Sequence, residues 1–317
     1  MNGAWLLLDL VLVPMILAAA LCAVGARAQF TGIVFYIVYG LLLALAWVRL
    51  GAENVALAEA AIGAGLTGVL LLGALARLPA AAPAEPGADG SPGTALRLAA
   101  AILCAALALG LGAAVLALPE PAPGLADVAA AHLPATGLGN PVTAVLLVWR
   151  GYDTLLEVVV LLLALLGVWS LTPDPLWGGV PGPRHRTRPE GVLVFLGRVL
   201  PPAGLLVGAH VFWAGADRPG GAFQAGTILA AVWLLAIMAG LTDAPAVRGL
   251  ALRLVLVGGP AVFLGVGLAG LATAGAFLGY PPDFVKPLVV LVEAALTLSI
   301  AVTLGLLVAG APERPPR

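Results

Sequence analysis

Nine long apolar stretches follow one another along this chain of 317 residues, and they constrain its fold more than any other feature. They cover residues 5–24, 30–48, 55–75, 96–118, 154–171, 192–213, 224–241, 252–277 and 285–308. A helix of about 20 apolar residues crosses the hydrocarbon core of a bilayer. The fifth stretch could begin earlier, near Val142, because residues 142–149 are apolar as well. The pattern predicts an all-α, polytopic integral membrane protein with about nine transmembrane helices.

The composition excludes most other classes of protein. Hydrophobic residues make up 62% of the chain and charged residues 10%, whereas a soluble domain carries roughly 25% charged residues. The apolar runs are rich in Ala, Gly and Leu and lack the alternation of a membrane β-barrel. The net charge of −1 gives no support for nucleic-acid binding. The expected surroundings are the lipid bilayer of the cell's inner or cytoplasmic membrane.

The basic residues predict how the chain is oriented. With nine spans, alternate loops lie on opposite sides, and cytoplasmic loops carry an excess of Lys and Arg. Three basic residues fall on the side of the N-terminus and eleven on the other side, with Arg150 left out because it lies at membrane depth. The three are Arg49, Arg218 and Lys286, and the eleven are Arg27, Arg77, Arg97, Arg184, Arg186, Arg188, Arg198, Arg248, Arg253, Arg314 and Arg317. The N-terminus is therefore expected outside and the C-terminus in the cytoplasm.

Two stretches interrupt the apolar pattern. Residues 79–92 are rich in Pro, Ala and Gly and are typical of a flexible linker. Residues 172–189 contain five prolines and a basic cluster, and they form a second predicted linker on the cytoplasmic side. The two divide the chain into blocks of three, two and four helices, which favours an assembly of short modules. The alternative is that both are ordinary long loops.

The sequence gives no support for catalysis, a cofactor or a metal. It contains three His and two Cys, and Cys22 and Cys104 sit in separate apolar segments without metal-ligand spacing. They indicate neither a disulfide framework nor an iron–sulfur site, and small packing residues are the expectation. No nucleophile elbow, phosphate-binding loop, dinucleotide fingerprint or zinc motif occurs. We therefore expect no enzyme activity within this chain.

Charged side chains at membrane depth are costly and usually face a protein interior or water. The densest cluster is Arg150, Asp153 and Glu157 in WRGYDTLLEVVVLLL. In a helix, spacings of three and four residues place all three on one face. Arg150 would keep Asp153 ionised, which makes the deeper Glu157 the better candidate for reversible protonation. The alternative is a structural ion pair that fixes this helix to its neighbours.

Two further carboxylates lie in apolar segments. Glu59 begins the third span and precedes several glycines, which allow close helix approach and a local bulge. Glu293 is the deepest charge of the last span, and Lys286 is expected to extend its amine toward the outer interface instead. Neither carboxylate has an evident cation within the chain, so both are candidates for an ion or proton pathway. Asn54 is expected to cap the third helix.

Weaker candidates are a lone histidine, an acidic residue near the membrane edge and a glycine-rich outer loop. His210 could belong to the pathway or be a hydrogen-bonded packing residue, and Asp9 could reach water. In residues 216–226, Pro219-Gly220-Gly221 predicts a tight turn with positive φ at both glycines, and Gln224 then opens a helix. The exposed N–H groups of that helix could hold a carboxylate or an anion from a neighbour. The alternative is a plain interhelical turn.

Three motifs, in this order, resemble components of one set of membrane complexes. Residues 31–76 resemble the D subunit of membrane-bound hydrogenases and the related end of the large A subunit of Mrp-type cation/proton antiporters. The family pattern there is Pro-Asp followed by V-A-L-T-E, for which this chain has Glu53-Asn54, Ala58 and the retained Glu59. Residues 140–171 resemble the E subunit of the same hydrogenases, whose pattern R-x-x-D-T-x-x-E is matched in full. The matching residues are Arg150, Asp153, Thr154 and Glu157.

The third motif resembles the B subunit of the antiporters, with a signature close to G-H-x-x-P-G-G-G-F-Q-x-G in residues 192–308. Ala216 replaces its His and Ala222 one Gly, while Glu293 falls where that protein carries a glutamate. The matching residues are Gly215, Pro219, Gly220, Gly221, Phe223, Gln224 and Gly226. The resemblance implies three modules, covering residues 1–78, 95–172 and 189–310.

The resemblance also implies a role. Such modules lie in membrane arms related to respiratory complex I, beside large antiporter-like subunits that carry the main proton channels. The chain would be a non-catalytic subunit that contributes buried carboxylates to an ion or proton pathway. The complex could be a secondary cation/proton antiporter, the membrane arm of a redox enzyme such as a hydrogenase, or a machine coupled to another reaction such as inorganic-carbon uptake. A purely structural scaffold is the remaining alternative.

Overall fold

A computed structural model describes residues 3–78, 93–119, 124–185 and 191–315, and the predicted linker at 79–92 lies outside them. By their contacts, the residues fall into two compact units. The first unit consists of Met1–Ala76 together with His132–Arg317, and the second unit is Arg77–Ala131. The second unit contains helix α5 (Thr94–Leu116), which has no buried residue. Its cysteine, Cys104, is exposed, as is Cys22 of the first unit, so neither packs inside the chain as expected.

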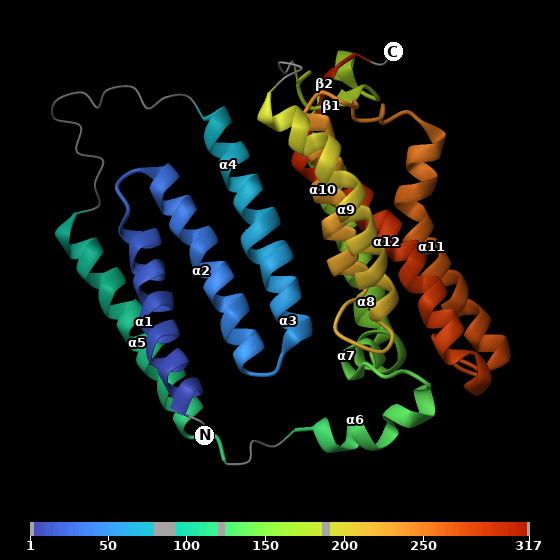
Figure 1. Cartoon of the computed structure of the whole chain (residues 1–317), viewed down its shortest axis with the longest axis horizontal. Helices are drawn as coiled ribbons and strands as arrows, with labels where there is room; N and C mark the ends of the chain where they lie inside the picture. The colour runs from blue at the N-terminus through green and yellow to red at the C-terminus, as the bar shows by residue number, and fades with distance from the viewer. Residues whose placement is uncertain (1–2, 79–92, 120–123, 186–190, 316–317) are drawn as a thin grey trace. The chain divides into compact units, whose positions relative to one another are not determined.

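The N-terminal part of the first unit is built from three helical segments (Figure 1). Helices α1 (Gly3–Gly25) and α2 (Gln29–Arg49) pack together, and the third segment runs from α3 (Glu53–Ala58) through the π-helix η1 (Glu59–Leu66) into α4 (Thr67–Arg77). Gly40 of α2 lies against Ala64 of η1, where an added Cβ would come within 3.0 Å of the Ala64 Cβ. The small residues of this segment therefore permit close helix packing, and the bulge expected after Glu59 is present.

The C-terminal part of the first unit is a helical bundle around one central helix, α12 (Val285–Ala309). It packs against α8 (Gly151–Trp169), α9 (Val192–Ala214), α10 (Ala222–Met238) and α11 (Leu250–Thr273). In the 18-residue apolar stretch of the span that contains α12, 61% of the residues are buried. In the other long apolar helices the corresponding share is 28% or less. Gly226 of α10 and Gly259 of α11 meet α12 at positions where a side chain would collide with it. This packing places Glu293, on α12, in the interior of the bundle.

The segment before α8 begins as a helix and then breaks. After α6 (Ala126–His132) and the 3-10 turn η2 (Leu133–Thr136), a single turn α7 (Pro141–Thr143) leads into the π-helix η3 (Ala144–Trp149). Arg150 has φ −126° and ψ 31°, which are not helical angles, and α8 starts at Gly151. The earlier helix start expected near Val142 is therefore found, but its helix is not continuous with the fifth span.

The other end of the bundle is tied together by the C-terminal segment. After the 3-10 turn η4 (Asp174–Leu176), strand β1 (Val180–Pro181) pairs antiparallel with β2 (Pro312–Arg314) (Figure 1). Arg314 also forms an ion pair with Asp243 at 2.9 Å. The second predicted linker, residues 172–189, is thus folded over the part that the structure describes, up to residue 185. A further 3-10 turn, η5 (Pro282–Phe284), leads into α12.

All nine apolar stretches contain helix, and the prediction of an all-α, polytopic membrane protein is confirmed. Within the described residues, eight helices are long and apolar enough to cross a membrane. The seventh stretch corresponds to α10, an apolar helix of 17 residues that is shorter than these eight. The number of spans and the orientation of the chain remain predictions.

Candidate functional site

A cavity of about 200 Å³ lies where the N-terminal segments meet the C-terminal bundle. Its lining comes from α3, η1, α7, η3, α8, α10, α12 and the loop before α10. The polar side chains among the lining residues are Asn54, Thr143, Thr154, Glu157, Gln224 and Glu293. Apolar side chains, among them Ile62, Phe223 and Leu296, make up much of the remainder. Two carboxylates thus share one largely apolar chamber.

Glu293 is the buried carboxylate of this cavity, with 4% of the residue exposed. The backbone N–H of Ala222, the first residue of α10, donates a hydrogen bond to the Glu293 carboxylate. Gly221 lies directly beside it, since an added Cβ there would come within 3.1 Å of Oε1. The positive end of the α10 dipole therefore faces the carboxyl group of Glu293, and it would favour the ionised form of that group. The carboxylate expected at this loop is that of Glu293, while its other oxygen, Oε2, has no hydrogen-bond partner.

Glu157 lines the same cavity from α8, but its side chain is more exposed than that of Glu293. Arg150 and Asp153 form the expected ion pair, with 71% and 51% of their side chains exposed. Neither of these two residues lines the cavity. The expectation that Arg150 shares a helix face with the two carboxylates is wrong, because the helix breaks at Arg150, whereas Asp153 and Glu157 keep their four-residue spacing within α8. The ion pair lies at the start of α8, and Glu157 is the residue of this motif that reaches the cavity.

The helix break before α8 leaves two backbone carbonyl groups of η3, and two side-chain hydroxyl groups donate hydrogen bonds to them. The Thr154 hydroxyl donates to the carbonyl of Leu146 at 2.6 Å, and the Tyr280 hydroxyl donates to the carbonyl of Leu147 at 2.9 Å. Burial raises the pKa of Tyr280 to about 12. Without these donors, the carbonyls would be unpaired in apolar surroundings, which is costly. The threonine of the R-x-x-D-T-x-x-E pattern thus stabilises the break, and Tyr280 is a partner that the motif did not indicate.

The Pro-Gly-Gly loop adopts the turn expected from its sequence. Gly220 and Gly221 have φ angles of 155° and 126°, a region that favours glycine. A Cβ at Gly220 would collide with the carbonyl of Val211. Gln224 does not open the helix as expected, because α10 already begins at Ala222. Gln224 instead donates from Nε2 to the carbonyl of Asn54 at 3.4 Å.

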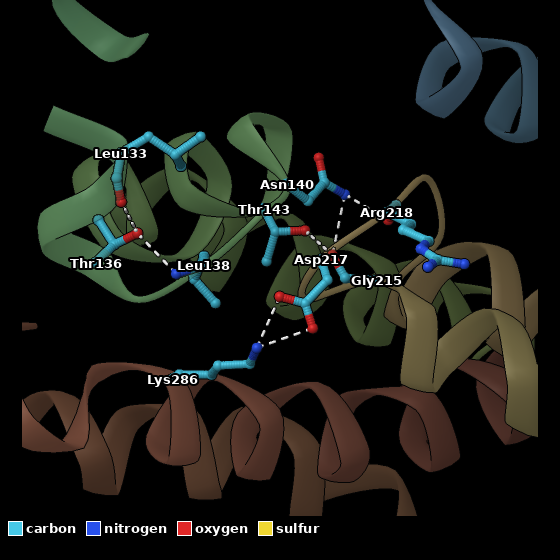
Figure 2. A network of polar contacts seen from close by, with 9 residues as sticks. All are labelled: Leu133, Thr136, Leu138, Asn140, Thr143, Gly215, Asp217, Arg218 and Lys286. Atoms are coloured by element: carbon cyan, nitrogen blue, oxygen red, sulfur yellow. Dashed lines mark hydrogen bonds and ion pairs between the residues drawn. The ribbon is translucent and has the colours of Figure 1, made fainter. Parts of the chain in front are cut away.

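Two asparagines join this loop to distant parts of the chain. The expectation that Asn54 caps its helix is wrong, because the cap position belongs to Ala52. Asn54 and Asn140 instead pair side chain to side chain at 3.3 Å. Asn140 also donates to the carbonyls of Gly215 and Arg218, both at 2.9 Å, and Figure 2 shows its amide directed at this loop. No sequence motif singled out Asn140.

Lys286 is paired outside the cavity. Its amine contacts both carboxylate oxygens of Asp217, at 2.7 and 2.8 Å (Figure 2). The hydrogen bond from Lys286 holds the pKa of Asp217 below its usual range. Lys286 is thus the partner of a loop carboxylate, and Glu293 has no ion pair among the described residues.

The remaining candidates lie away from the cavity. Glu59 is half-buried, and its carboxylate folds over Gly63 within η1. It forms no ion pair with a described residue and does not line the cavity. His210 is exposed on α9 and does not line the cavity either. Asp9 pairs with Arg49 at 2.9 Å. The described residues contain no group of His, Cys, Asp and Glu that could hold a metal ion.

Comparisons with known proteins match two regions of the chain. Residues 14–80 match the MbhD family, the D subunit of MBH, and residues 192–312 match a domain related to the MnhB subunit of a Na+/H+ antiporter. The fold is similar to that of a chain in the Mrp complex from Dietzia sp. DQ12-45-1b, with a TM-score of 0.73 and 25% sequence identity. That likeness covers 98% of the present chain and 35% of the Dietzia chain. No match was found among curated proteins.

The helical architecture and these matches define the chain as a multi-pass protein of the cell membrane, of the kind found in Mrp-type complexes. More particularly, the chain joins a region that matches the MbhD family and a region related to MnhB in one polypeptide. Residues 140–171, which contain Glu157 and for which the sequence predicts a likeness to the hydrogenase E subunit, lie between the two matched regions.

Proposed function

We propose that this chain contributes Glu157 and Glu293 to an ion or proton pathway in an Mrp-type cation/proton antiporter complex. The observation that carries the proposal is the buried Glu293 carboxylate, whose Oε2 has no partner and which lines a cavity shared with Glu157. A buried ionised carboxylate without a cation is costly. A proton, a cation or water bound in the cavity would reduce that cost. A carboxylate that alternates between its protonated, cation-bound and hydrated states is suited to transport.

The other predicted pathway residues would act outside this cavity. Glu59, Arg150, Asp153 and His210 do not line it. Arg150 and Asp153 are exposed at the start of α8, so they are placed to contact water or a neighbouring subunit. We assign Glu157 and Glu293 to the path itself, and we leave the other four as candidates for its ends.

The proposed partners are the other membrane subunits of the complex, including large antiporter-like subunits that carry the main proton channels. Many apolar side chains of this chain are exposed, among them those of α5, which has no buried residue. In the membrane, lipid or neighbouring subunits would cover them. The three predicted modules, residues 1–78, 95–172 and 189–310, would each meet different neighbours.

A second candidate is the membrane arm of a redox-driven complex. The match of residues 14–80 to the MbhD family favours it. The two candidates differ in the proteins that accompany this chain. Purification of the intact complex through a tag on this chain, followed by mass spectrometry, separates them: iron–sulfur or nickel-binding proteins indicate the redox complex, and antiporter proteins alone indicate the secondary antiporter.

The test of the pathway uses Glu293→Gln in the complete complex, because glutamine keeps the size and polarity of the side chain but cannot exchange a proton. We expect normal recovery of the complex and loss of cation-dependent proton movement in everted membrane vesicles. Glu53→Gln is the matched control, since Glu53 is exposed and does not line the cavity. Normal transport by an assembled Glu293→Gln complex would show that the pathway does not use this carboxylate.

A further inference from the structure

The loop that brings Ala222 to Glu293 is held by side chains from two distant segments. Asn140 is 2% exposed, and its Nδ2 donates to the carbonyls of Gly215 and Arg218. The hydroxyl of Thr143 donates to the same Gly215 carbonyl at 2.6 Å (Figure 2). These bonds fix the beginning of the loop, because they occupy backbone carbonyls that have no helical partner.

Asn54 fixes the end of the loop, next to the cavity. Its Oδ1 accepts a hydrogen bond from the N–H of Gly220 at 3.1 Å, two residues before Ala222. Its side chain also pairs with that of Asn140, and its backbone carbonyl accepts a bond from Gln224 of α10. The contacts of Asn54 therefore lie on both sides of Ala222 along the chain. A shift of α3 would move the loop, the start of α10, or both.

We propose that Asn54 and Asn140 are positioning residues that hold the Ala222 N–H against the Glu293 carboxylate. The proposal rests on the proposed role of Glu293, but neither asparagine touches that residue. Asn54 belongs to the MbhD-like region, and the loop belongs to the MnhB-related region. Through the amide pair, a displacement of the MbhD-like region would thus move the loop that contacts Glu293 in the MnhB-related region. No motif of either region indicates this contact, because it forms only where the two meet.

Few ionisable groups of the described residues could influence the charge of Glu293. Glu157, from α8, is the other ionisable residue that lines the cavity. Helix α10 contributes no ionisable side chain to the contact with α12. Lys286, on α12 itself, is paired with Asp217. The other charged or titratable residues of α8, α9, α11 and η5 do not line the cavity; they are Tyr152, Asp153, Arg198, His210, Arg253 and Asp283. Besides burial itself, the Ala222 N–H is therefore the local group of the described residues that bears on the charge of Glu293.

The test compares Asn54→Leu with Asn54→Asp in the intact complex. Leucine has a similar size but no acceptor for the Gly220 N–H, whereas aspartate retains one. A carboxylate that loses an N–H donor keeps its proton to higher pH. We expect Asn54→Leu to move the pH midpoint of transport upward by about one unit, the size of one lost hydrogen bond to a charged group. Hydrogen exchange in residues 215–226 should increase in Asn54→Leu and stay near the wild-type rate in Asn54→Asp.

The outcomes separate a positioning role from a structural one. Faster exchange in Asn54→Leu with an unchanged pH midpoint would overturn the proposal, because the loop would then be loosened without affecting Glu293. Unchanged exchange would overturn it as well. Glu53→Gln, on the adjacent exposed side chain, should alter neither measurement. If Glu293→Gln itself transports normally, the proposed function fails, whereas a normal midpoint in Asn54→Leu with an inactive Glu293→Gln rejects the positioning role alone.

Discussion

The backbone N–H of Ala222 donates a hydrogen bond to the buried carboxylate of Glu293, which joins the Pro-Gly-Gly loop to the central helix of the bundle. The same loop reaches α12 a second time, through the ion pair of Asp217 and Lys286. The two contacts fix both the start of α10 and the start of α12. The loop is therefore part of the cavity wall and is more than a connection between two spans.

Substitution of Gly221 by alanine should damage the site. Gly221 has a φ of 126°, and an added Cβ would lie 3.1 Å from Oε1 of Glu293. Backbone strain of this kind costs about 1–3 kcal/mol. We expect a lower thermal unfolding temperature of the complex and loss of transport. Gly258→Ala is the control, because a Cβ at Gly258 in α11 would meet no atom within 4 Å. Equal effects of the two substitutions would show that the loop tolerates a side chain.

The Asp217–Lys286 pair should weaken in acid. The hydrogen bond from Lys286 lowers the pKa of Asp217 in the folded chain. The pair therefore stabilises the fold above the unfolded pKa, and this contribution is lost as the pH falls through the folded pKa. Because both side chains are partly exposed, the effect should be about 0–1 kcal/mol. The difference in unfolding temperature between wild type and Asp217→Asn should be present near neutral pH and should shrink as the pH falls below about 4, the pKa of an unperturbed aspartate. A difference that persists in acid would contradict the ion pair.

Removal of the Tyr280 hydroxyl should destabilise the break before α8. Tyr280→Phe leaves the carbonyl of Leu147 without its donor, at a cost of about 1–3 kcal/mol. Tyr152→Phe is the matched control, because Tyr152 is exposed. The pKa of Tyr280 is raised to about 12, so its contribution is intact below the unfolded pKa and is lost as the pH rises through the folded pKa. Equal unfolding temperatures for the two phenylalanine variants would rule out this role for Tyr280.

The predicted orientation can be tested by cysteine labelling. The structure brings Asn54 and the loop around Arg218 to one end of the bundle. On the opposite side of the predicted topology lies Arg184. In a background where Cys22 and Cys104 are replaced by serine, Arg218→Cys should react with an impermeant thiol reagent in intact cells, and Arg184→Cys should react only after permeabilisation. The reverse labelling pattern would show that the chain has the opposite orientation in the membrane.

The sequence predicts the helices well because each apolar stretch carries its own signal, the length needed to cross a bilayer. It also predicts the Pro-Gly-Gly turn and the isolation of Glu293 from cations. It fails at Arg150, where helical spacing was assumed but the backbone breaks, since the hydroxyls of Thr154 and Tyr280 that compensate the break come from later in the chain. Asn140 was missed for a similar reason. Its partners are backbone carbonyls and a distant amide, and neither leaves a pattern in the sequence.

The most direct test of the shared cavity is cation-dependent proton movement in everted vesicles with Glu157→Gln, Glu293→Gln and both substitutions together. Residues that act as a unit give strongly non-additive losses. We predict that all three complexes assemble, that each single substitution strongly reduces transport, and that the double substitution is no worse than the more severe single one. If Glu157→Gln assembles and transports normally across the working pH range, the two carboxylates do not serve one pathway, and the Arg150, Asp153 and Glu157 cluster has a structural role instead.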